Sequence, residues 1–118
     1  MVKLEVDSAK KVFHVTVSGI VTAEDAQRYL NELEEKVKGV DPKQYILLID
    51  AREQKTLTAD ATPLLEKCMK FYTETPFRKR FSVILESAIA MLQVKKVSKE
   101  AVDEFIMVSS VEEAYKNI

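Results

Sequence analysis

The chain has 118 residues, 47% of them hydrophobic and 31% charged, which is typical of one globular domain rather than a disordered or membrane-spanning protein. Its formal net charge of -1 excludes the long-range attraction that steers proteins to nucleic acid or acidic membranes. The opening residues, MVKLEVDSAKKV, lack the apolar core of a signal peptide. We therefore expect a single cytoplasmic domain over residues 1–118, without nucleic-acid binding or membrane insertion.

The first two stretches with alternating apolar and polar residues predict an antiparallel hairpin. Apolar residues alternate with charged ones in Val2–Val6, and Val12–Ser18 alternates in the same way after a polar turn. His14, the only histidine, lies on the less apolar face of the second strand. Gly19 is expected to end that strand.

An amphipathic helix should follow the hairpin. Thr22 and Asp25 resemble a capping box, and apolar residues then recur at helical spacing to about Lys38. Gly39 suits the C-terminal cap of this helix, and Pro42 prevents the helix from resuming.

Tyr45–Ala51 is apolar on both faces, which predicts a strand inside a parallel part of the sheet. A polar loop, Arg52–Leu57, should lead to a second helix with Thr58 as its N-cap and Pro63 in its first turn. Since ligands and partners often meet a sheet at the carboxyl ends of its strands, we expect this region to carry the function.

The remaining elements complete a β-β-α-β-α-β-α-β-α order. The pattern predicts a strand over Phe81–Leu85, a helix over Ser87–Val97, a helical turn over Ser98–Glu104, a strand over Phe105–Val108 and, after a Ser110 capping box, a helix over Val111–Asn117. This order predicts an α/β fold with a mixed four- to five-stranded sheet, right-handed crossovers and helices mainly on one face.

Residues that could support catalysis are few. Cys68 cannot form an internal disulfide or a zinc site alone, and it is interpreted as a buried small hydrophobe rather than a reactive thiol. There is no recognisable nucleophile with its base, and two glycines are too few for a phosphate-binding loop. We expect no catalytic residue, metal or cofactor; the alternative is a metal or substrate site at Asp50, Arg52 and Glu53.

The run Arg78, Lys79 and Arg80, together with Lys70, is the one concentrated basic patch. It could dock an acidic partner or a phosphate. Without interleaved exposed aromatic residues, the pattern favours a lead-in to the next strand that keeps the sheet edge soluble over a nucleic-acid site.

Three stretches resemble the STAS domain, the fold of sulfate-transporter cytoplasmic domains and anti-sigma-factor antagonists. They read VFHVTVSGIVTAEDAQRYLNELEE from Val12, YILLIDAREQKTLTADATPLLEKC from Tyr45 and DEFIMVSSVEEAYKNI from Asp103. Their counterparts are the second strand with the first helix, the central strand with the loop into the second helix, and the last strand with the closing helix. The resemblance implies a STAS-like or SpoIIAA-like domain with a non-catalytic, bacterial-type regulatory role.

The resemblance also implies a surface that a protein partner recognises. Carried onto this sequence, it comprises the strand end, the loop and the start of the second helix: Asp50, Arg52, Gln54, Lys55, Thr58, Asp60 and Thr62. Homodimerisation through the half-apolar first hairpin is a further expectation.

In the phosphorylated antagonists, a serine in an Asp-Ser pair at the start of the second helix is the substrate of a partner kinase. The corresponding position falls near Thr58 and Ala59, where this chain has no Asp-Ser pair. Thr58 and Thr62 are the candidate phosphoacceptors, because a helix N-terminus favours a phosphate. The other interpretation of Thr58 is a simple N-cap.

SpoIIAA-like proteins near lipid-binding folds suggest an alternative function, a carrier of a small apolar ligand or lipid. It requires a pocket between the second and third helices, around Leu65, Met69, Met91 and Leu92. Methionine-rich packing in an ordinary core would explain the same residues.

Overall fold

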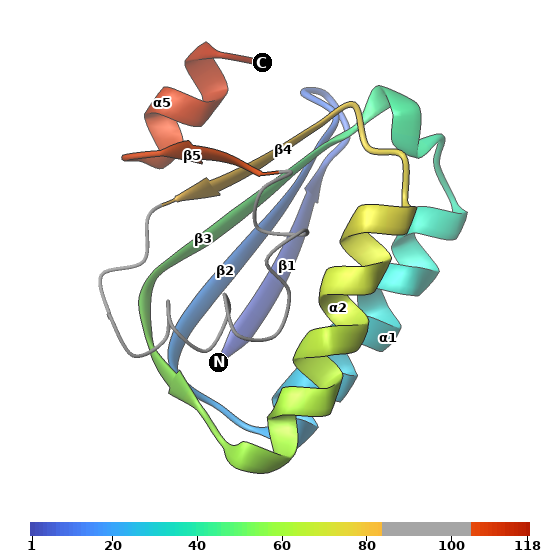
Figure 1. Cartoon of the computed structure of the whole chain (residues 1–118). Helices are drawn as coiled ribbons and strands as arrows, with labels where there is room; N and C mark the ends of the chain where they lie inside the picture. Colours follow the sequence, from blue (N-terminus) through green and yellow to red (C-terminus); the bar gives the residue numbers. More distant parts are fainter. Residues whose placement is uncertain (84–104) are drawn as a thin grey trace.

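A five-stranded mixed sheet forms the centre of this computed structural model, which describes residues 1–83 and 105–118 (Figure 1). The strands lie in chain order: β1 (Val2–Asp7), β2 (Val12–Val21), β3 (Ile46–Leu57), β4 (Lys79–Val83) and β5 (Ile106–Val108). β1 is antiparallel to β2, and the other neighbouring pairs are parallel. The predicted hairpin, the interior position of β3 and the mixed α/β fold are confirmed.

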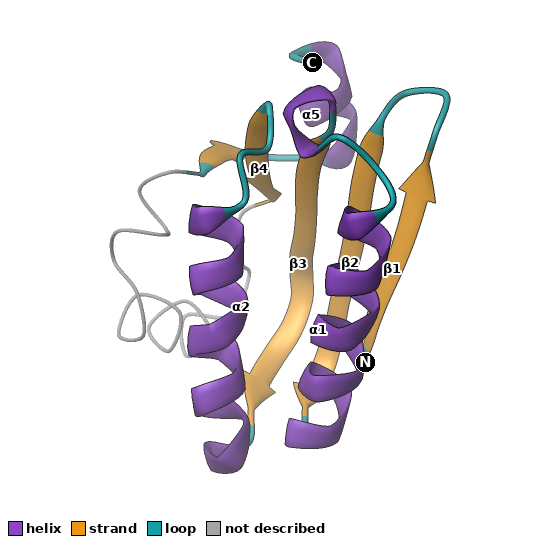
Figure 2. Ribbon diagram, turned by 90° about the vertical axis from the view of Figure 1, so that its right-hand side faces the viewer, coloured by secondary structure: helices purple, strands orange, loops and turns teal. Residues whose placement is uncertain are grey.

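Two long helices cover one face of the sheet, and a short one covers part of the other (Figure 2). α1 (Ala23–Lys38) and α2 (Thr62–Glu74) pack on Phe13, Val15 and Leu47. α5 (Val111–Lys116) contacts the alternate residues, including Leu48 and Phe81, through Ala114. Among the described helices, none is long and apolar enough to cross a membrane.

The polar loop predicted at Arg52–Leu57 is wrong, because β3 continues to Leu57 and pairs with the end of β2. The expectation that Gly19 ends β2 is wrong for the same reason, since β2 continues to Val21. The register shifts twice along this pairing, after Thr16 and after Gly19, and each time β3 contributes the additional residue. Such bulges interrupt the two-residue alternation that identifies a strand in sequence.

Hydrogen bonds at the helix ends agree with most of the predicted caps. Thr22 and Asp25 form the complete capping box of α1. Ser110 accepts a hydrogen bond from the backbone N–H of Glu113 at 3.1 Å, but the Glu113 carboxylate accepts from Ser109 instead. Gly39 occupies the C-cap of α1 in a right-handed conformation.

β4 begins two residues before its predicted start, because Lys79 and Arg80 already pair with Ile46 and Leu47. Lys79 and Arg80, two of the three residues expected to lead into the strand, are therefore part of it, and Arg78 lies before it. The predicted helix over Ser87–Val97 and the turn over Ser98–Glu104 lie outside the described residues. Two short 3-10 turns complete the described structure, η1 (Pro42–Gln44) and η2 (Ala59–Ala61).

Candidate functional site

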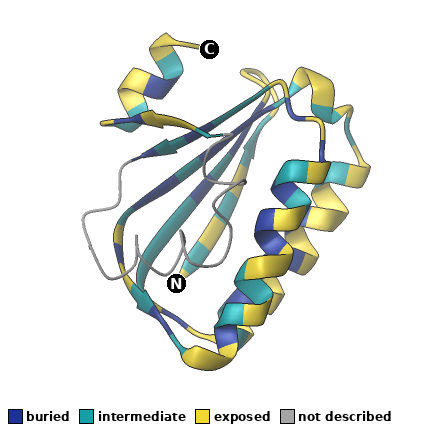
Figure 3. Ribbon diagram, in the orientation of Figure 1, coloured by how far each residue is buried: buried dark blue, intermediate teal, exposed yellow. Residues whose placement is uncertain are grey.

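The end of β3, the η2 turn and the start of α2 follow one another along the chain, and we call residues 52–63 the β3–α2 surface. Figure 3 shows exposed residues along the end of β3 and through the turn into α2. Lys55 and Asp60 are exposed, whereas Thr58 and Thr62 are half-buried. Four of the predicted partner-contacting residues are therefore accessible here.

Asp50 and Arg52 form an ion pair in β3, beside the last described pair between β3 and β4. The Arg52 Nε and Nη2 atoms donate to the two carboxylate oxygens of Asp50, each at 3.0 Å, and the Arg52 backbone N–H donates at 3.3 Å. Burial alone raises the pKa of Asp50, but the hydrogen bonds and charge of Arg52, with a smaller effect of His14, bring that pKa below its ordinary value. The pair is therefore ionised, and it holds the strand end in place.

This pairing weakens the alternative of a metal or substrate site at Asp50, Arg52 and Glu53. Both carboxylate oxygens of Asp50 already accept hydrogen bonds from Arg52, so a metal ion at Asp50 would lie close to the positive charge of Arg52, which would repel it. Across residues 1–83 and 105–118, no group of three or more His, Cys, Asp or Glu side chains could hold a metal ion.

Gln54 differs from what its place in a predicted polar loop suggested. Its side chain is buried, with 8% of the residue exposed, and it lies opposite Gly19 in the β2–β3 pairing. The neighbouring Lys55 is exposed. Asp50 and Gln54 are therefore buried in the sheet. Their side chains are less accessible than that of Lys55.

Thr58 joins the strand end to the turn, but its side chain does not cap a helix as predicted. Its backbone N–H donates to the Val21 carbonyl at 2.9 Å, which extends the β2–β3 pairing by one bond. Its hydroxyl donates to the Asp60 carboxylate at 2.5 Å rather than accepting a hydrogen bond from a backbone N–H. α2 begins at Thr62 with Pro63 in its first turn, as predicted for the proline.

His14 shares a sheet face with Asp50, a relationship that local sequence patterns did not indicate. The register places His14 opposite Leu48 and Thr16 opposite Asp50. The imidazole ring lies 6.5 Å from the Tyr115 ring at 72°, and its buried Nε2 has no hydrogen-bond partner among the described residues. Placing His14 and Asp50 on one face requires the register between β2 and β3, which local sequence patterns do not contain.

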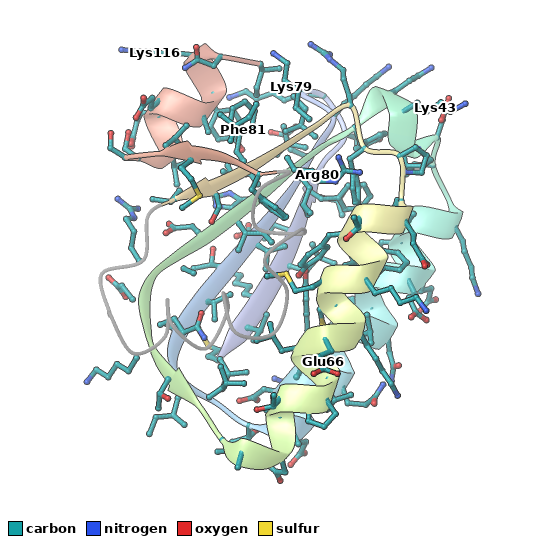
Figure 4. The ribbon with its side chains drawn as sticks, viewed as in Figure 1. Lys43, Glu66, Lys79, Arg80, Phe81 and Lys116 are labelled. Atoms are coloured by element: carbon teal, nitrogen blue, oxygen red, sulfur yellow. The ribbon has the colours of Figure 1, made fainter. Side chains whose placement is uncertain are left out.

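Two residues of the basic run, Lys79 and Arg80, donate hydrogen bonds at helix ends, and Figure 4 labels both side chains. Arg80 donates to the carbonyl oxygens of Tyr72 at 2.7 Å and Thr75 at 2.6 Å, at the C-terminus of α2. Lys79 donates to the Asn117 carbonyl at 2.8 Å, just after α5. Cations at helix C-termini satisfy unpaired carbonyls and interact favourably with the helix dipole, so two of these side chains have a structural role.

Cys68 is buried, as predicted, in the core cluster between the sheet and the long helices. Burial, with a smaller effect of Glu34, raises the pKa of its thiol to about 12. Since the thiolate is the nucleophile, this thiol is poorly suited to react at neutral pH.

The residues proposed for an apolar pocket are only partly described. Met69 is buried in the same core cluster as Cys68, and the half-buried Leu65 packs against that cluster. Met91 and Leu92 lie outside the described residues. The two described members therefore contribute to the packed interior between α2 and the sheet.

No family model matches the chain, and no curated protein matches it in sequence. Solved structures do match it. An uncharacterised DUF3478-family protein from Shewanella loihica PV-4, described as having a SpoIIAA-like fold, aligns with a TM-score of 0.70 at 17% identity, covering 98% of this chain and 90% of that one. The chain has the SpoIIAA-like fold.

Two structures of SpoIIAA itself support the same conclusion. The unphosphorylated anti-sigma factor antagonist matches with a TM-score of 0.65 at 8% identity, covering 99% of this chain and 96% of that one. The phosphorylated form, described as a Bacillus cell fate determinant, matches with a TM-score of 0.68 at 11% identity, covering 99% of this chain and 98% of that one. The SpoIIAA-like fold expected from the STAS resemblance is confirmed, and it matches structures of both phosphorylation states.

Proposed function

We propose that this SpoIIAA-like domain is a non-catalytic cytoplasmic regulator that binds another protein through the β3–α2 surface. The observation that carries the proposal is that Lys55 and Asp60, two exposed residues of opposite charge, flank Thr58, whose backbone N–H is bonded to the Val21 carbonyl. Two similar structures belong to a protein described as an anti-sigma factor antagonist, which supports a regulatory role.

The geometry divides the predicted partner residues into two groups. Lys55, Thr58, Asp60 and Thr62 would contact the partner, because they are exposed or half-buried around one turn. Asp50 and Gln54 are buried and would act by holding the strand end, while Arg52 lies between the groups with its side chain 38% exposed. A loop held by a rigid strand is a common way to present binding residues.

Phosphorylation of this surface is part of the proposal, with Thr62 as the preferred acceptor. A phosphate on Thr58 would face the Asp60 carboxylate, to which the hydroxyl now donates, and like charges would repel. Thr62 begins α2, whose first turn contains no acidic residue, so the positive end of the helix dipole would favour a phosphate there. Modification would then add negative charge to the β3–α2 surface and alter partner binding.

The test is partner capture from a lysate of the host, using a charge exchange, Lys55→Glu with Asp60→Lys. The exchange keeps the net charge but reverses the charge pattern of the surface. A matched control is Glu32→Lys with Lys36→Glu, two exposed positions on α1. The proposal predicts a partner that wild type and control retain and that the surface variant loses; retention by all three would contradict it.

Native mass spectrometry of protein purified from the host separates this proposal from the carrier and tests the switch. A co-purifying apolar ligand that dissociates from the intact domain would favour the carrier. A mass increase of about 80 Da, from one added phosphate, should map to the Thr62 peptide and disappear in Thr62→Ala but persist in Thr58→Ala.

A further inference from the structure

β1 lies at the edge of the sheet, and among the described residues no element pairs with its outer side (Figure 2). The hydrogen bonds to β2 establish which backbone groups point outward. The amino group of Met1 donates to the Ser18 carbonyl at 2.6 Å, and the Ser18 N–H donates to the Met1 carbonyl at 2.9 Å. Because the direction alternates along an antiparallel strand, Lys3 and Glu5 also point their backbone groups at β2. Val2, Leu4 and Val6 therefore direct theirs away from the sheet.

The side chains of β1 separate into two kinds, one on each face. Val2, Leu4 and Val6 pack against the core on the face that carries α1. Lys3 and Glu5 point to the opposite face, where their side chains are 62% and 60% exposed and form an ion pair of 3.7 Å. A neighbouring strand would thus meet apolar residues on one face and alternating charges on the other.

We propose that this edge pairs antiparallel with β1 of a second copy of the chain, about a two-fold axis through Leu4. The outward backbone groups of Leu4 would then bond to those of Leu4 in the second copy, and those of Val2 to Val6. Lys3 of each copy would lie directly opposite Glu5 of the other, in the non-hydrogen-bonded pairs where side chains approach most closely. The two sheets would join into one, through an interface in which each copy uses the same residues.

Charge complementarity selects this register over its neighbours. A two-fold axis at Lys3 or at Glu5 would place identical charges opposite each other. An axis at Val6 would set Glu5 against Asp7, and an axis at Val2 would set Lys3 against the amino group of Met1. Like charges directly opposite on a sheet are destabilising, so the axis at Leu4 is the one with attraction across both pairs.

Edge strands often carry lysine to prevent pairing with other chains, which is the competing explanation for Lys3. A lysine without an opposite charge would repel the same lysine of a second copy across the edge. Here Glu5 supplies the opposite charge. It lies two residues from Lys3, so an axis at Leu4 between them places Lys3 of each copy opposite Glu5 of the other. A short strand buries less surface than a stable dimer needs, so the dimer should form at high protein concentration and dissociate on dilution.

The test uses Lys3→Glu and Glu5→Lys, measured by sedimentation velocity and native mass spectrometry over a range of concentrations. Each single variant places like charges across both pairs, and the dimer should weaken by about tenfold or more. An equimolar mixture of the two variants restores attraction, so a heterodimer should form. The double variant within one chain should dimerise as wild type does.

Lys67→Glu and Glu66→Lys serve as controls, because they make the same charge changes on exposed positions of α2. Both controls should dimerise like wild type, and circular dichroism should show all variants folded. A wild-type protein that stays monomeric would overturn the proposal, as would a dimer indifferent to the variants at Lys3 and Glu5. Partner capture through the β3–α2 surface is measured separately, so either proposal can fail alone.

Discussion

Arg52 binds the carboxylate of Asp50 through two side-chain hydrogen bonds of 3.0 Å, beside the last described pair between β3 and β4. Beyond this pair, β3 is hydrogen-bonded to β2, and Asp50 opposite Val83 is the last described pair between β3 and β4. The ion pair therefore stabilises the part of the strand that leads into the β3–α2 surface.

Replacement of Asp50 by Asn should lower the free energy of unfolding at neutral pH. It should also make that free energy fall less as the pH is lowered. The lowered pKa of Asp50 means that its contribution is fully present above the ordinary carboxyl value of 3.8 and is lost as pH falls through the lower value in the folded protein. Because Arg52 loses its charged partner, we expect a cost of about 1–3 kcal/mol at pH 7. Urea unfolding from about pH 7 to pH 2 measures both effects. The exposed Glu32→Gln should unfold like wild type at neutral pH, and equal acid sensitivity of wild type and D50N would contradict the assignment.

Removal of the Arg80 guanidinium should weaken the junction between α2 and β4. Arg80→Ala leaves the carbonyl groups of Tyr72 and Thr75 without this donor, at an expected cost of about 1.5–3 kcal/mol for hydrogen bonds to a charged group. Arg78→Ala, at the exposed position just before β4, should change stability by less than about 0.5 kcal/mol. Chemical denaturation compares the two variants, and similar losses would show that net charge rather than capping matters.

The sequence predicted those parts of the fold in which local pattern and tertiary structure agree. Alternation identified β1 and β2, and the continuous apolar run identified the interior half of β3. The second half of β3 was missed because bulges shift the alternation, so charged Glu53 and Lys55 surround a buried Gln54. The second half of β3 pairs with the end of β2. Gly19 predicts that β2 ends before this pairing, although the strand continues to Val21.

The candidate site was located more reliably than its contacts. A strand ending in Asp50 and a turn into α2 follow from composition and periodicity. The two carbonyl partners of Arg80 and the shared face of Asp50 and His14 depend on three-dimensional proximity. No spacing rule encodes these contacts. Thr58 is a different case, because its hydroxyl has two local options, a backbone N–H and the Asp60 carboxylate two residues later, and the structure has the second.

Gly19 should be sensitive to substitution because of its backbone conformation rather than a lack of space. Its φ is +63°, a left-handed value, and an added Cβ would meet nothing within 4 Å. Gly19→Ala should therefore destabilise the protein by about 1–2 kcal/mol. Gly39→Ala is the matched control: Gly39 is right-handed, the nearest atom to its Cβ would be 3.6 Å away, and the change should be neutral or slightly stabilising. Thermal unfolding ranks the pair, and an equal effect of both would argue against strain at Gly19.

Tyr29 and Tyr72 should behave as one buried unit that joins α1 to α2. Their hydroxyl groups are hydrogen-bonded to each other, each residue is 5% exposed, and burial raises the pKa of both. Tyr29→Phe or Tyr72→Phe alone leaves one buried hydroxyl without its partner, at a cost of about 1–3 kcal/mol. The double variant removes both polar groups and should cost clearly less than the sum of the two single changes. Urea unfolding of the four proteins gives the coupling energy, with far-UV circular dichroism as the check on folding. Additive losses would mean that each hydroxyl is stabilised separately, in which case the contact between the two helices would rest on apolar packing around Cys68 instead.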